Sequence, residues 1–78
     1  MDNRKIVTEN LVMAERCVRE GIKHIARQQQ WVRELERDDL AATAIQANAL
    51  LRQFEDSFAL HVADRDRLFA ELKQIDEA

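Results

Sequence analysis

Apolar residues recur along the first half of the chain at spacings that alternate between three and four. Two series with a seven-residue repeat make up this pattern: Leu11, Val18, Ile25 and Val32, and Val7, Ala14, Gly21, Gln28 and Leu35. This heptad pattern is typical of an amphipathic helix that packs along a partner in coiled-coil fashion. It predicts a first helix over residues 4–37, approximately.

The second half of the chain repeats the pattern with the same regularity. Its two series are Ala47, Phe54, His61, Leu68 and Ile75, and Ala44, Leu51, Phe58, Arg65 and Leu72. We therefore expect a second helix over residues 43–76, approximately, and we refer to the two series on each helix as its seam.

The segment between the two patterns carries turn chemistry. Asp38 and Asp39 are poor residues for a helix interior and good ones for a cap or turn. Thr43 followed by Gln46 matches a capping box, in which each side chain bonds a free backbone N–H at the start of a helix. These signals predict a loop at about residues 38–42.

One continuous helix of about 70 residues, roughly 100 Å long, is the alternative. Extending the Val32 series across the join gives only polar residues, so a single seam does not continue through it. The pattern favours an all-α fold in which residues 1–78 form one domain, a helical hairpin of two long antiparallel helices.

The length of the loop determines which residues face each other. A loop over 38–42 gives facing residues whose numbers sum to about 82, which places Gly21 opposite His61. A tighter turn lowers the sum to about 79 and places Gly21 opposite Phe58. Both registers set small residues of the first helix against bulky ones of the second.

The apolar surface is wider than one partner helix can cover. The chain has 78 residues, one glycine and no proline, and 46% of its residues are hydrophobic. Apolar or weakly polar residues lie beside both seams, and a hairpin leaves such flanks in water. We expect two hairpins to pair as a homodimeric four-helix bundle, with a complex with another protein and a monomer as alternatives. The candidate dimer or partner interface is Cys17, His24, Trp31, Val62 and Phe69.

Three polar residues interrupt the seams: Gln28, His61 and Arg65. Polar residues at such positions set helix register and oligomeric state at some expense of stability. A titratable pair that senses pH or holds an acidic ligand is the functional alternative. We interpret the three as a polar seam layer with a structural role.

Charge argues against nucleic acid as a partner. Residues 1–37 carry a net charge of +2 and residues 38–78 carry −5, which together give the net charge of −3. The two halves suit mutual pairing better than they suit a polyanion. The stretch RQQQWVRELER combines basic and aromatic residues, as in RNA-binding segments, but Glu34 and Glu36 dilute its charge.

Catalytic and metal-binding patterns are weak. Ser57 is the only serine and has no glycine-rich elbow around it. Cys17 and His24 lie on one helix flank but about 10 Å apart along the axis, so one ion would also need His61 or a second subunit. We expect no enzymatic activity, no cofactor and no metal site.

The expected location is the cytoplasm. A lone cysteine, Cys17, fits a reducing compartment. The chain has no apolar run of about 18 residues for a membrane span, and its N-terminus shows no apolar leader.

Two stretches carry a resemblance to a known set of proteins. AERCVREGIKHIARQQQWVRELERD and ALLRQFEDSFALHVADRDRLFAEL resemble short, uncharacterised helical-hairpin proteins of alphaproteobacteria, common in the rhizobial group. The residues that match the shared pattern are Ala14, Glu15, Arg16, Glu20, Gly21, Ile25, Ala26, Arg27, Gln28, Leu50, Leu51, Phe54, Glu55, His61, Asp64, Arg65, Asp66, Arg67 and Leu68. Where the pattern has a glycine after Asp38, this chain has Asp39. The resemblance implies a bacterial, cytoplasmic protein and brings no activity, cofactor or partner.

Two functions fit these features. The first is a small non-enzymatic protein that works through protein–protein interaction, as a structural or adaptor element and as a hairpin dimer. The second is a small ligand-, pH- or metal-responsive regulator that uses the polar residues around His61 and Arg65.

Overall fold

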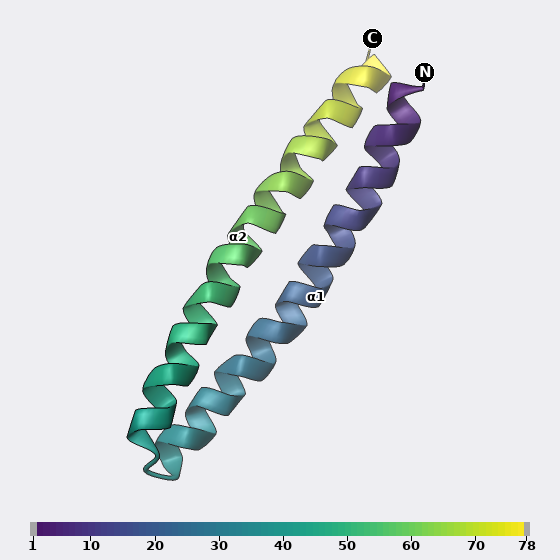
Figure 1. The fold of residues 1–78 in the computed structure, drawn as a ribbon. Coiled ribbons are helices and arrows are strands. Elements are labelled where there is room, and N and C mark those ends of the chain that lie inside the picture. Colours follow the sequence, from purple (N-terminus) through teal and green to yellow (C-terminus); the bar gives the residue numbers. More distant parts are fainter. Residues whose placement is uncertain (1, 78) are drawn as a thin grey trace.

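The chain forms two long helices that run antiparallel to each other and pack along their length (Figure 1). The computed structural model describes residues 2–77. Helix α1 spans Asn3–Arg37 and helix α2 spans Ala41–Glu77. The described chain measures 58 × 18 × 14 Å, so it is a rod of two helices. The expected all-helical hairpin is confirmed, and the single continuous helix is excluded.

The turn between the helices is short and tightly hydrogen-bonded. Asp39 donates its backbone N–H to the carbonyl of Glu36 at 3.2 Å, and Leu40 donates to the carbonyl of Leu35 at 3.0 Å. These two bonds form a Schellman motif, which satisfies carbonyls at the helix end. The motif requires a left-handed backbone at Asp39, where φ is 60°. Glycine adopts this conformation most easily, which explains why a glycine is expected there.

Helix α2 begins two residues earlier than the capping box predicts. The N–H of Ala44 already donates to the carbonyl of Leu40 at 2.8 Å, so Thr43 lies inside the helix. The Schellman motif completes the chain reversal by Leu40, and Ala41 and Ala42 are strong helix formers. The expected loop at 38–42 is therefore shortened to residues 38–40.

Replacing Asp39 with glycine is expected to stabilise the hairpin. A left-handed conformation costs a non-glycine residue on the order of 1 kcal/mol, and glycine removes that strain while adding some entropy to the unfolded chain. We expect Asp39→Gly to raise the free energy of unfolding by up to about 1 kcal/mol. Thermal unfolding followed by circular dichroism measures the change. Asp39→Val should destabilise the protein, because a β-branched residue disfavours a positive φ. A stabilised valine variant would contradict this account of the turn.

The short turn selects the tighter of the two possible registers. Gly21 lies against the ring of Phe58, so the numbers of these facing residues sum to 79. The register that places Gly21 opposite His61 is therefore not the one that forms. The absence of a side chain at Gly21 allows α1 to approach the aromatic ring of α2 closely.

The buried core is small and lies mostly near the turn. Val32, Leu35, Ala44 and Ala47 form one buried cluster, with Leu51 packed against it. Leu11, Val18 and Leu68 are the other buried hydrophobic side chains of the described chain. In the middle of the rod, Phe54 and Phe58 are only half-buried. The packing is therefore tightest at the turn and looser along the central third.

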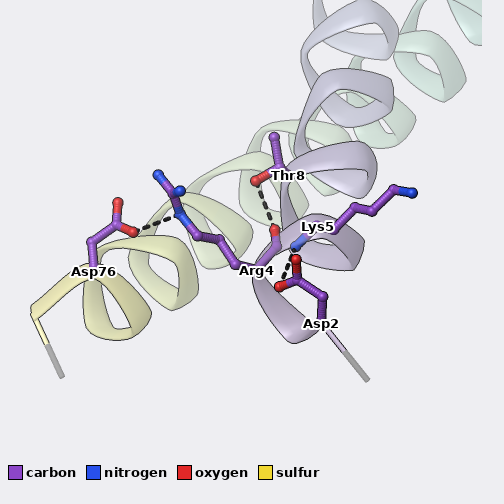
Figure 2. Close-up of polar contacts among 5 residues, drawn as sticks. All are labelled: Asp2, Arg4, Lys5, Thr8 and Asp76. Atoms are coloured by element: carbon purple, nitrogen blue, oxygen red, sulfur yellow. Dashed lines mark hydrogen bonds and ion pairs between the residues drawn. The ribbon is translucent and has the colours of Figure 1, made fainter.

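Polar contacts hold the open end of the hairpin (Figure 2). The Asp2 carboxylate caps α1 by accepting from the backbone N–H of Lys5 at 3.3 Å, which satisfies a free donor. Arg4 of α1 pairs with Asp76 of α2 at 2.8 Å. Both side chains of this pair are exposed, so it contributes at most about 1 kcal/mol. Its clearer effect is to link the first turn of α1 to the last turn of α2.

Candidate functional site

A groove opens beside the Gly21–Phe58 contact, and we call it the central groove. It has a volume of about 290 Å³, and its walls include Cys17, Gly21, His24, Phe54, Phe58 and His61. The rings of His24 and Phe54 lie 6.2 Å apart across it, tilted by 40°. Gly21 adds no side chain to its floor, and the two half-buried phenylalanines make its surface mostly apolar.

A second groove lies on the opposite side of the seam, and we call it the opposite groove. It has a volume of about 590 Å³ and is lined by Glu15, Val18, Arg19, Ile22, Arg65, Asp66 and Phe69. Successive helical residues are about 100° apart, so Ile22 lies about 140° around α1 from Cys17. Four of the seven lining residues are charged, so this groove is more polar than the central one.

The candidate interface residues divide between these two sides. Cys17 and His24 line the central groove, and Trp31 lies farther along the same side, in a groove with His24 and Phe54. Phe69 lines the opposite groove. Val62, one heptad before Phe69 on α2, belongs to that same side. The five residues therefore do not form one continuous surface.

The antiparallel arrangement explains this division. Cys17, His24 and Trp31 each come one residue before a member of the Leu11 series of the α1 seam. Val62 and Phe69 each come one residue after a member of the Ala47 series of the α2 seam, so the two groups lie on different flanks of their seams. The sequence pattern gives the number of residues by which each side chain is offset from its seam. Which flanks of two antiparallel helices meet on one side depends on how the seams are paired.

The predicted polar seam layer is also separated in space. Gln28 lies nearer the turn, where its Nε2 donates to the carbonyl of Ala47 at 2.9 Å. Arg65 donates from Nε and Nη2 to Asp66 at 3.1 and 3.0 Å and lines the opposite groove. His61 lines the central groove. The three side chains make separate local contacts, and no shared layer joins them.

Two aromatic residues that the sequence pattern did not indicate as site residues form part of the wall of the central groove. Phe54 and Phe58 occupy heptad positions of the α2 seam, where full burial is the usual outcome. Both are half-buried, and both line the central groove. The feature of the sequence that points to a groove beside these rings is the placement of Gly21 opposite Phe58 in the tighter register.

Metal binding finds no support within residues 2–77. No group of three or more histidine, cysteine, aspartate or glutamate side chains in that range is arranged to hold an ion. Cys17 is exposed and forms no disulfide. Neither of the two described helices is long and apolar enough to cross a membrane.

Replacing His61 with leucine is expected to keep or raise stability. His61 is half-buried against apolar groove walls, so leucine adds apolar contact there. We expect the free energy of unfolding to rise by up to about 1 kcal/mol, the value of one or two buried methylenes. Urea unfolding followed by circular dichroism measures it. A loss greater than about 1 kcal/mol would show that His61 makes a stabilising polar interaction.

Comparisons with models of protein families, with curated proteins and with solved structures gave no match. The resemblance to short alphaproteobacterial proteins therefore stays a prediction.

Proposed function

We propose that the protein is a small, non-enzymatic interaction protein that acts as a dimer of hairpins, a four-helix bundle. The observation that carries the proposal is its large surface. The accessible surface is 6158 Å², whereas a compact 9.1 kDa monomer has about 4,900 Å². The radius of gyration is 17.5 Å, against about 11.5 Å for a compact chain of this length.

The excess surface is larger than the area that a standard dimer interface covers on one partner. It amounts to roughly 1,300 Å², and a standard interface buries about 800 Å² on each partner. Large apolar side chains contribute to it: Trp31 is 50% exposed and Phe69 is 59% exposed. A single core in a chain this short seldom provides more than about 3–5 kcal/mol, so association would add stability that the monomer lacks.

Solution mass and melting temperature test the proposal together. We expect multi-angle light scattering to give twice 9.1 kDa at micromolar concentration and above. The melting temperature should rise with protein concentration, because dimerisation stabilises the folded state by mass action. A mass of one chain at every concentration, with a constant melting temperature, would contradict the dimer.

A responsive regulatory module is the second candidate. It is supported by one observation, that Cys17, His24 and His61 line the same groove. Binding or protonation at these groups would alter the apolar surface around Phe54 and Phe58. Titration with Zn²⁺ and variation of pH from 5 to 8 test this function. An unchanged melting temperature and mass across both series would argue against it.

We also place the protein in the bacterial cytoplasm. The support is its single, exposed cysteine, which suits a reducing compartment, and the resemblance to alphaproteobacterial hairpin proteins.

A further inference from the structure

We propose that two copies of this chain meet through the central groove, and that Trp31 of each copy packs into the central groove of the other. This inference rests on the proposed dimer and names the surface that forms it. The central groove and Trp31 lie on one side of the hairpin, and we call this the Trp31 side.

The chemistry of the two sides favours this one. The exposed surface of the central groove is mostly apolar, with Arg16 and Glu20 as its charged lining residues, whereas four of the seven residues that line the opposite groove are charged. A fully buried interface core disfavours charge and is enriched in tryptophan, which often dominates binding energy. The volume of about 290 Å³ is ample for an indole ring, since a cavity of roughly 150 Å³ accepts benzene.

The spacing along α1 makes this side complementary to itself. Trp31 lies seven residues after His24, and Cys17 lies seven residues before it, each about 10 Å along the axis. Consider a two-fold axis that lies between the two copies, passes beside His24 at right angles to α1, and sets the two α1 helices antiparallel. It brings each Trp31 to the Cys17 end of the other copy's central groove. The two contacts are equivalent, as a two-fold interface requires.

The same arrangement also pairs opposite charges. Arg27 lies three residues after His24 and Glu20 lies four before it. A two-fold axis at His24 therefore brings Arg27 of one copy close to Glu20 of the other. Measured along the helix axis, the two residues differ in position by only about 1.5 Å. Glu20 and Arg27 line the grooves of the Trp31 side. Two reciprocal ion pairs would then fix the antiparallel register of the copies.

Cysteine crosslinking tests which side meets the second copy. In a Cys17→Ala background, first verified by light scattering to dimerise, His24→Cys places a thiol at the proposed axis. We expect a short bis-maleimide to convert this variant to a covalent dimer at least tenfold faster than Ile22→Cys in the same background. Ile22 is the matched control, because it is two residues away but lines the opposite groove. Faster crosslinking of the Ile22→Cys variant would overturn the proposal.

Affinity measurements supply the second readout. We expect Trp31→Ala to raise the dimer dissociation constant at least 30-fold, the effect of losing a dominant interface residue. Trp31→Phe should raise it less, because an aromatic ring remains. Phe69→Ala, on the opposite side, should change it less than threefold. Trp31 is the only tryptophan, so its emission should shift to shorter wavelength as the wild-type dimer forms.

The outcomes separate this inference from the proposed function. A dimer that depends on Phe69 and not on Trp31 would overturn the Trp31 side as the interface while leaving the dimer intact. A monomer at all concentrations would remove both.

Discussion

Leu35→Ala is expected to unfold most of the protein at low concentration. Leu35 is the most deeply buried large side chain of the cluster beside the turn, with 4% of its surface exposed. Truncating a buried leucine to alanine costs about 2–5 kcal/mol, because apolar contact is lost and a cavity remains. That cost is comparable with the roughly 3–5 kcal/mol that a single core of this size provides.

Urea unfolding of Leu35→Ala, followed by circular dichroism and compared with wild type at equal concentration, measures this loss. Ile45→Ala is the matched control, since it removes a similar side chain from the same end of the rod. Ile45 is 71% exposed, so its loss should change the free energy of unfolding by less than about 0.5 kcal/mol. Equal effects from the two variants would show that the cluster at the turn does not anchor the hairpin.

The two helices could be predicted because their periodicity is sustained over many turns. Val18 and Leu68 recur at heptad positions, and both are buried where the helices meet. Each heptad adds independent support for the same helix face, so one irregular residue such as Gln28 does not obscure it. The weakest prediction lay where that support ends, in the few residues of the turn.

The turn could not be predicted exactly because it depends on an unusual backbone conformation. Thr43 and Gln46 match a capping box, yet the helix begins at Ala41. The left-handed backbone of Asp39 completes the reversal earlier, and aspartate adopts that conformation far less often than glycine. This local difference shortens the loop and so selects the register in which Gly21 lies against Phe58.

The residues of the candidate interface lie on two sides of the hairpin, and their role as an interface stays a prediction. Cys17, His24 and Trp31 lie on one side, as their heptad spacing indicates. Phe69 lies on the other, because pairing two antiparallel seams brings like flanks together. The offsets of these residues from their seams, combined with antiparallel pairing, account for this division, and the width of the apolar surface alone does not indicate it.

Gly21→Leu is expected to disrupt the middle of the hairpin. A Cβ at position 21 would lie 2.7 Å from Cδ1 of Phe58, closer than real Cβ contacts come. Leucine is a better helix former than glycine by somewhat less than about 1 kcal/mol, so local propensity alone predicts a gain. Forcing a large side chain into this contact costs about 1–3 kcal/mol or more, and here it also separates the helices. We expect a net loss of about 2 kcal/mol in urea unfolding.

A double-mutant cycle with Phe58→Ala identifies the cause. Phe58→Ala alone removes a half-buried ring and should cost about 2–3 kcal/mol. In the double variant, Leu at position 21 occupies the space that the ring leaves, and its helix propensity is no longer opposed by a clash. The double variant should therefore be more stable than the sum of the two losses predicts, by about 2–3 kcal/mol. Additive losses would mean that Gly21 is required for a reason other than its contact with Phe58. If Phe58→Ala is unfolded on its own, Phe58→Leu provides a milder background, in which the same sign of coupling is expected.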